Sequence, residues 1–225
     1  MMGIGQSTTN GRVALGRSSG QGRFDGLLIA AAMLAVSGAG CTKPTSISVS
    51  MKYKPTSSVG VSGFPVTAGT TLFIEPIVDE RAIKDRVGEY SEDDELSVPA
   101  NAEGTPVPEF VQHALVRALA DLGIKTVDEA SAANRIMTVT LIKCWTNEHG
   151  KFGPTSMYDS EVRTTIKVAD TSGTVLCEGV YSGSNSRFGG DHNEDNYQEG
   201  LSDAIVDLIT RLGASPAFQK AIVSQ

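Results

Sequence analysis

The feature that most constrains the fold is a helix with a single apolar face, predicted for residues 107–122. Apolar residues there recur at i, i+3, i+4, i+7 and i+8, which is the spacing of one helix face. They are Val107, Phe110, Val111, Ala114, Leu115, Ala118, Leu119 and Leu122. Pro106 or Pro108 suits the first turn of this helix, and Gly123 suits its end. A helix of this kind must cover a second layer of structure.

A second helix is predicted over residues 196–212, with Gly213 as its end. Its inward residues are Tyr197, Leu201, Ala204, Ile205, Leu208 and Leu212. Ser215 and Pro216 combine a capping residue with a first-turn proline. They therefore predict the start of a short terminal helix.

Between the two helices the residues alternate as in β-strands. Residues 135–145 carry apolar side chains on both faces, which predicts a central strand. One face holds Ile136, Thr138, Thr140, Ile142 and Cys144, and the other holds Met137, Val139 and Leu141. Residues 161–168 alternate with one polar face, and residues 174–182 pair back on them across a turn at 170–173.

The N-terminal half is predicted to add shorter strands. Residues 47–51 alternate like a strand, and residues 71–78 form a buried strand that Pro76 either places at a sheet edge or ends. Residues 124–127 predict a further short strand. Residues 79–104 are strongly charged, which predicts an exposed excursion.

The predicted order of elements is strand, strand, helix, strands, helix, and each helix has one apolar face to cover. We therefore expect an α+β domain of two layers, in which a mostly antiparallel sheet packs against two main helices. This single domain spans residues 70–225 and includes the acidic loop 79–104.

The first forty residues are predicted to lie outside this domain. An apolar run of 11 residues, 26–36, follows a segment that contains three arginines. The run is too short for a helix across about 30 Å of hydrocarbon, which takes about 20 residues. It has the length of a signal-peptide core. Four small residues, 37–40, and then Cys41 follow the run.

The order of basic, apolar and small residues and then cysteine resembles a bacterial lipoprotein signal. By this resemblance, residues 1–40 are a signal peptide that is removed, and Cys41 becomes the acylated N-terminus. Residues 41–69 then form the lipidated N-terminus, a linker and a first strand. Two alternatives stay open: an ordinary signal peptide in which Cys41 is incidental, and a cytosolic protein with an apolar N-terminal helix.

The acidic charge argues against two kinds of partner. The formal charge is -7, and removing residues 1–40 leaves 16 basic and 25 acidic residues, so the mature chain is near -9. Such a chain binds poorly to nucleic-acid phosphates and to anionic lipid headgroups. We expect no nucleic-acid partner, and we expect membrane attachment through lipid on Cys41.

Three groups of polar residues are candidate sites, and each also has a simpler structural interpretation. Asp191–Asp195, in a predicted loop over 184–196, contains metal-ligand types but lacks the spacing of a calcium loop and suits a helix N-terminus. His149, in a predicted polar loop over 146–156, is expected to be solvated. The acidic run Glu92–Glu95 could bind a basic partner or simply be a solvated loop.

The remaining chemistry is limited. Cys144 and Cys177 could form a disulfide in an oxidising envelope or be two buried thiols. In a simple meander a third strand separates them, too far for a bond. The sequence holds no nucleophile elbow, P-loop, dinucleotide fingerprint, C-x-x-C or H-E-x-x-H, and its three histidines lie on different elements. We expect no enzymatic activity, no cofactor and no metal. The one predicted site residue is Cys41, for lipidation.

Several segments resemble the YajG-like lipoproteins in order and pattern. They are the start Cys41-Thr42-Lys43-Pro44 with the strand-like Ile47-Ser48-Val49, the helix and short strand of Val107–Val127, the strand pair within Arg135–Tyr181, and the closing helix around Ala204–Asp207. The resemblance spans most of residues 41–223. It implies an envelope lipoprotein of small α+β architecture without an established enzymatic activity.

These observations predict a non-enzymatic, lipid-anchored interaction or assembly module, attached to the outer membrane and facing the periplasm, with other envelope proteins as partners. The alternative is an accessory subunit of a lipid, transport or secretion complex that binds an apolar ligand. A large apolar cavity between sheet and helices would favour that alternative. A hydrolase with a non-standard site would need His149 or His192 within hydrogen-bond reach of a serine and an acid.

Overall fold

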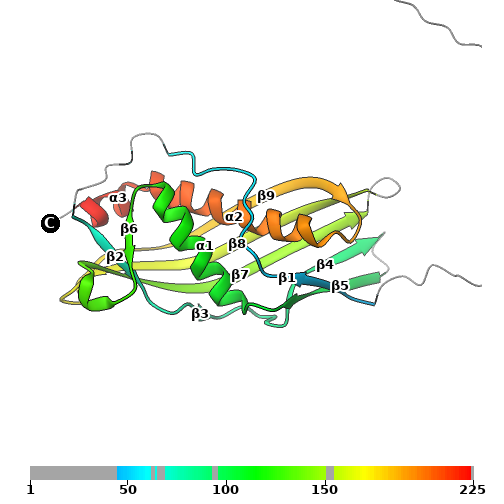
Figure 1. Ribbon diagram of the computed structural model, residues 1–225, viewed down its shortest axis with the longest axis horizontal. Coiled ribbons are helices and arrows are strands. Elements are labelled where there is room, and N and C mark those ends of the chain that lie inside the picture. Colours follow the sequence, from blue (N-terminus) through cyan, green and yellow to red (C-terminus); the bar gives the residue numbers. More distant parts are fainter. Residues whose placement is uncertain (1–44, 62–63, 65–68, 93–95, 151–154, 224–225) are drawn as a thin grey trace, which may run out of the picture. The chain divides into compact units, whose positions relative to one another are not determined.

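The computed structural model describes residues 45–61, 64, 69–92, 96–150 and 155–223, which form an α+β domain around one sheet (Figure 1). The strands are β1 (Ile47–Ser50), β2 (Thr71–Ile74), β3 (Val78–Asp79), β4 (Arg86–Glu92), β5 (Leu96–Glu103), β6 (Lys125–Val127), β7 (Arg135–Gly150), β8 (Thr155–Asp170) and β9 (Val175–Gly190). The helices are α1 (Val107–Asp121), α2 (Glu194–Ala214) and α3 (Pro216–Val223).

Three strands of 16 residues each, β7, β8 and β9, form an antiparallel meander. The polar loops predicted at 146–156 and 184–196 are therefore wrong over most of their length. β7 continues to Gly150, β8 begins at Thr155, and β9 continues to Gly190. Alternation of apolar and polar residues did not reveal these ends of the strands, because polar side chains lie on both faces of the sheet there. The buried polar side chains hydrogen-bond to one another, as Thr146 does with Ser160 and Glu148 with Tyr158.

The turn predicted between β8 and β9 is confirmed. Asp170 Oδ1 accepts hydrogen bonds from the backbone N–H groups of Ser172 and Thr174, each at 2.9 Å. Gly173 has a φ of 88°, which a residue with a Cβ adopts only with strain. The Asp-Thr-Ser-Gly sequence thus fixes the tight connection that keeps β8 and β9 in register.

The other edge of β7 pairs in succession with three short strands that run parallel to it. β2 pairs with residues 135–137, β3 with residues 140–141 and β4 with residues 146–149. Pro76 lies between β2 and β3, so it ends the first ladder, which is one of the two effects predicted for it. One long strand is thereby shared among three segments of the N-terminal half.

The sheet is mixed. β4 pairs antiparallel with β5, whereas β5 and β1, and β2 and β6, pair in parallel. Five of the eight pairings between described strands are parallel, so the prediction of a mostly antiparallel sheet was wrong. The acidic excursion predicted at 79–104 was also wrong, because β4 and β5 belong to the sheet and place Val87, Tyr90 and Ala100 in the core.

Helices α1 and α2 contact each other over one face of the sheet, and α3 contacts α2, β8 and β9 (Figure 1). All eight apolar residues predicted for the inner face of α1 are buried, as are all six predicted for α2. Gly123 has a φ of 79° directly after α1, which confirms it as the stop. The description of two main helices omits α3, which the capping pattern predicted and which buries Phe218 and Ile222.

Residues 51–61, here called the strap, lie along α2. The side-chain oxygens of Ser202, Asp203 and Thr210 accept hydrogen bonds from strap backbone N–H groups at 2.9, 2.8 and 3.2 Å. The strap covers a side of α2 that the sheet does not, which explains why 14 of the 21 residues of α2 are buried. The segment in which we predicted a linker is thus bound to the domain at least as far as Gly60.

Candidate binding site on the open face of the sheet

The sheet face opposite the helices carries partly exposed, mostly polar side chains. Along β8, the even-numbered residues from 156 to 168 are buried against the helix layer, and most odd-numbered ones stand partly exposed on the other side. We call this other side the open face. On β7, β8 and β9 it includes Lys143, Trp145, Asn147, His149, Asp159, Glu161, Arg163, Ser184 and Ser186.

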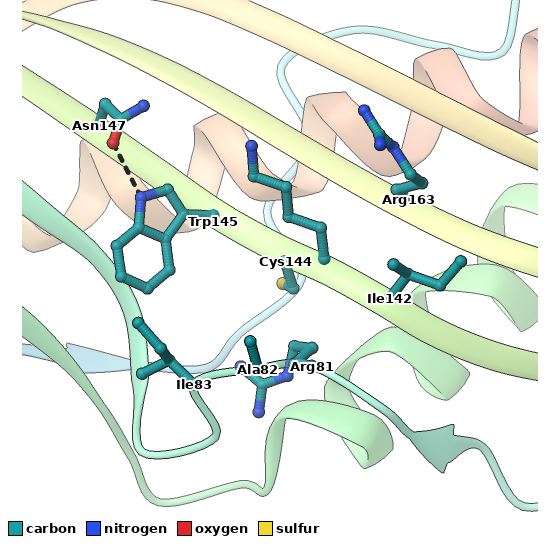
Figure 2. A pocket seen from close by; sticks show the side chains of 9 residues that line it. Arg81, Ala82, Ile83, Ile142, Cys144, Trp145, Asn147 and Arg163 are labelled. Carbon is teal, nitrogen blue, oxygen red and sulfur yellow. Dashed lines mark hydrogen bonds between the residues drawn. The ribbon is translucent and has the colours of Figure 1, made fainter.

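A hollow of about 470 Å³ lies on this face beside β7, and we call it the β7 hollow (Figure 2). Its lining residues are Arg81, Ala82, Ile83, Ile142, Lys143, Cys144, Trp145, Asn147 and Arg163. The hollow lies where β7 changes partner, because β3 pairs no further than Leu141 and β4 pairs only from Thr146 onward. Residues 80–85 loop out between these two strands and form one wall.

Arg81 holds this loop in place. Its guanidinium binds both carboxylate oxygens of Asp79 at 3.0 Å and the carbonyl oxygens of Lys84 and Arg86 at 2.9 and 3.0 Å. The side chain is only 4% exposed. Burial tends to raise the pKa of Asp79, but bonding to Arg81 outweighs it, so the pKa lies below its usual value. The wall is thus fixed by an ion pair with Asp79 in which the Arg81 guanidinium is buried and donates four hydrogen bonds.

A bulge in β7 shapes the floor of the hollow. The pairing with β8 shifts register between Leu141 and Lys143, so Ile142 is an extra residue and is 37% exposed. Beyond the bulge the alternation is inverted, and Cys144 is buried on the same side as Leu141. The prediction that Cys144 shares a face with Ile136 was therefore wrong, because strict alternation cannot foresee an inserted residue.

The apolar part of the hollow comes from Ile83, Ile142 and Trp145, with Ile83 44% exposed. The indole Nε1–H of Trp145 donates to Asn147 Oδ1 at 2.8 Å, which fixes the ring at the rim (Figure 2). A fixed aromatic ring and two exposed aliphatic side chains make a preformed surface for an apolar group.

Two cations on the rim share one carboxylate. Glu161 accepts from Lys143 Nζ at 2.7 Å and from Arg163 at 2.6 Å. Hydrogen bonding to Lys143 is the largest of several effects that together lower the pKa of Glu161. The two basic side chains are 41% and 48% exposed, so both can also reach a bound molecule.

The two cysteine thiols in the described residues are buried and unreactive. Cys144 and Cys177 are free and buried, with β8 between their strands, so the structure supports the buried-thiol interpretation over the disulfide. Burial raises the pKa of Cys144 to about 12. A thiol in this state is not a nucleophile near neutral pH.

His149 makes one of the two hydrogen bonds that a hydrolase site would need, the one to a serine. Its Nδ1 lies 3.1 Å from Ser91 Oγ, but its Nε2 lies 3.9 Å from Asp159 Oδ2, beyond hydrogen-bond reach. Ser91 stands within a paired strand, opposite His149 on one side and Ser97 on the other, and not on the sharp turn of a nucleophile elbow. The arrangement therefore gives hydrolysis little support.

Residues 191–195 act as the cap predicted for α2. The Asn193 side chain accepts a hydrogen bond from the backbone N–H of Asp195 at 2.9 Å. Glu194 accepts from the backbone N–H of Ser50 at 3.0 Å, and Asp195 binds Lys54 Nζ at 2.6 Å. Among the residues the structure describes, no three His, Cys, Asp or Glu side chains converge as metal ligands.

Glu148 was expected in a solvated loop, and this was wrong because its side chain is fully buried. Its carboxylate accepts from the hydroxyls of Tyr158 and Tyr197 at 3.0 and 2.8 Å and from the backbone N–H of His192 at 2.7 Å. Burial, followed by the charge of Glu148, raises the pKa of Tyr197. His192 has a φ of 53°. This cluster joins the end of β7 to the turn before α2, and a single sequence offers no signal for such a long-range junction.

Two predicted features lie outside the described residues. They are Cys41, with the leader before it, and the side chains of the acidic run Glu92–Glu95. Within the described part, no helix is both long enough and apolar enough to span a bilayer. Lipidation of Cys41 stays a prediction.

No family model and no curated protein matches the chain. Among solved structures, XCC0632 from Xanthomonas campestris, of the DUF330 family, is 11% identical with a TM-score of 0.51, over 80% of this chain and 97% of that one. PelC from Paraburkholderia phytofirmans, a dodecamer, is 15% identical with a TM-score of 0.36, over 66% and 91%. A minor lipoprotein from Acinetobacter baumannii is 9% identical with a TM-score of 0.36, over 66% and 92%.

The likeness to XCC0632 concerns the fold alone, and it supports the α+β architecture. The other two resemble this chain too distantly for an argument from shape. None of these three structures is described as a YajG-like protein, so the resemblance to that family stays a prediction from sequence.

Proposed function

We propose that this chain is a non-enzymatic lipoprotein of the bacterial envelope, anchored through Cys41 to the outer membrane on its periplasmic side. In this proposal the open face of the sheet binds another envelope component. The observation that carries the binding role is the β7 hollow. The helices cover one face of the sheet, whereas the other face presents a preformed hollow with exposed aliphatic and basic side chains.

The position of β1 supports an anchor close to the domain. β1 begins at Ile47, six residues after Cys41, and is held in the sheet by β5. Six extended residues reach about 20 Å at most. A lipid on Cys41 would therefore hold the folded domain within about 20 Å of the membrane surface, where a mature chain of charge near -9 gains little from anionic headgroups.

The chemistry of the described residues supports a binding role over catalysis. The nearest approach to a catalytic set is Ser91, His149 and Asp159, which lacks a second hydrogen bond. The thiol of Cys144 is buried with its pKa raised to about 12. The β7 hollow, on the face of the sheet away from the helices, instead offers exposed aliphatic side chains beside basic ones.

The anchor is tested by mass spectrometry of the mature N-terminus. An N-terminal peptide that begins with acylated Cys41 is expected, and Cys41→Ala should leave protein that is soluble or uncleaved. An unmodified N-terminus elsewhere in the chain would rule out the anchor.

The interaction surface is tested by photo-crosslinking in intact envelopes. A photoreactive amino acid at Ile83, in the wall of the β7 hollow, should give a discrete adduct. The matched control places the same residue at Glu109, which is exposed on α1 in the helix layer. Equal adducts from both positions, or none from position 83, would remove the open face as the interaction surface.

A further inference from the structure

We propose that the β7 hollow binds a small amphiphile that has one apolar chain and one anionic head. This inference names a ligand class for the surface proposed above, and it rests on that proposal for its location. It does not depend on whether Cys41 is acylated.

The hollow has the size and rigidity of a small-molecule site. Its volume of about 470 Å³ lies within the range of about 300–1,000 Å³ typical of such sites. The 80–85 wall is fixed by the buried guanidinium of Arg81 and its bonds to Asp79, Lys84 and Arg86. A preorganised wall lowers the entropy cost of binding, because no loop has to become ordered.

The lining favours an apolar chain. Ile83 and Ile142 are two of the six large hydrophobic side chains exposed in the described residues, and both line this hollow. Trp145 completes the surface with a ring that Asn147 holds in place (Figure 2). Each methylene that moves from water onto these side chains strengthens binding, by up to about fourfold when it is fully buried.

The charges favour a single anionic head. The charge of Arg81 is balanced by Asp79, whereas Lys143 and Arg163 share the one carboxylate of Glu161. One positive charge is therefore left over at the rim. Asp159, the next carboxylate on the open face, lines a neighbouring hollow, so the head is expected beside Lys143 and Arg163 and not near Asp159.

The chain carries a reporter at this position, because Trp145 is its only tryptophan. The full chain with Cys41→Ser, which removes any attached acyl group, is titrated with dodecanoate below its micelle concentration while Trp145 emission is recorded. A saturable change is expected, with binding at least about fivefold weaker for dodecanol and dodecyltrimethylammonium and no change with acetate. Decanoate should bind about two- to fourfold more weakly per methylene removed.

Variants locate the binding site. Arg163→Gln and Lys143→Gln should each weaken dodecanoate binding about two- to fivefold, because both cations are partly exposed, and Ile83→Ser should weaken it further. Lys167→Gln is the matched control, a cation on β8 that does not line the hollow. Unfolding temperatures establish that each variant is folded.

Three outcomes would overturn the proposal: no saturable change, equal binding of dodecyltrimethylammonium, or equal effects of Arg163→Gln and Lys167→Gln. A parallel titration with dodecanoyl-lysophosphatidylglycerol distinguishes a free carboxylate from a lipid phosphate as the source of the head. Tighter binding of either one supports the proposal. Crosslinking from position 83 is a separate measurement, so a failed titration would leave the interaction surface itself standing.

Discussion

The carboxylate of Asp203 is predicted to hold the strap on α2. It accepts from the backbone N–H and hydroxyl of Thr56 at 2.8 and 2.5 Å, and from those of Ser57 at 2.9 and 2.8 Å. The Asp203 side chain is buried, but Thr56 and Ser57 are exposed. Asp203→Ala removes all four bonds at once, and water can replace only some of them.

The expected loss is about 3 kcal/mol in the free energy of unfolding. A hydrogen bond to a charged group contributes about 1.5–3 kcal/mol, and four bonds to one carboxylate are far from additive. For a chain of this size, 3 kcal/mol corresponds to a fall of about 6–12 °C in unfolding temperature. Thermal and urea unfolding, followed by circular dichroism, measure it. The matched control is Asp121→Ala, which removes an exposed carboxylate on α1 and should change stability by less than about 0.5 kcal/mol.

The pH dependence gives a second readout for Asp203. Burial tends to raise its pKa, but the bonds from Thr56 and Ser57 outweigh burial and lower it below 3.8. The carboxylate therefore stabilises the fold at pH values above 3.8, and this contribution is lost as the pH falls through the lowered value. The difference between wild type and Asp203→Ala should shrink below about pH 4. Equal effects of Asp203→Ala and Asp121→Ala, with unchanged hydrogen exchange over residues 51–61, would refute the strap contact.

Three further predictions concern the core. In the native protein at pH 8, Cys144 should react with iodoacetamide at least about 100-fold more slowly than in urea, because burial raises its pKa to about 12; comparable rates would contradict this. Glu148→Ala leaves the Tyr197 hydroxyl and the His192 backbone N–H without their acceptor, whereas the Tyr158 hydroxyl keeps the Gly190 carbonyl oxygen, and it should cost about 3 kcal/mol by urea unfolding; a cost under about 1 kcal/mol would count against the cluster. Gly183→Ala would place a Cβ 2.0 Å from the carbonyl oxygen of Ala204 and should cost about 2 kcal/mol or more, whereas Gly190→Ala meets nothing within 4 Å and should be nearly neutral.

Local patterns predicted the helices well and the sheet only in part. The face from Val107 to Leu122 and the stop at Gly123 follow from periodicity and backbone preference, which act over a few residues. Parallel pairing of β2, β3 and β4 with β7 joins segments about 60 residues apart, and alternation within a strand says nothing about its partner. Residues 79–104 looked like a loop because charged residues are frequent there, although Val87 and Tyr90 on β4 and Ala100 on β5 are buried in the core.

The binding site depends on features that a single sequence does not reveal. The hollow exists because an extra residue, Ile142, interrupts β7 opposite a loop, and bulges have no reliable sequence signal. Its rim depends on Lys143, Glu161 and Arg163, which two adjacent strands bring together. The buried position of Glu148 depends on Tyr158, Tyr197 and His192, whose approach follows from tertiary packing and not from spacing.

One edge of β7 pairs in succession with β2, β3 and β4, and the connection between β3 and β4 can vary in sequence without loss of these pairings. Residues 80–85 connect β3 and β4, and each of these strands pairs with β7 independently of the other. The length of the connection is therefore not set by the core. Doubling the length of such a connection costs only about 0.6 kcal/mol in closure entropy. Insertions or exchanges at Ala82 and Ile83, which keep Arg81 and its bonds, should thus reshape one wall of the hollow while the sheet, the helices and the strap stay as they are. In an engineering setting this loop is the position at which ligand preference can be varied with little risk to folding.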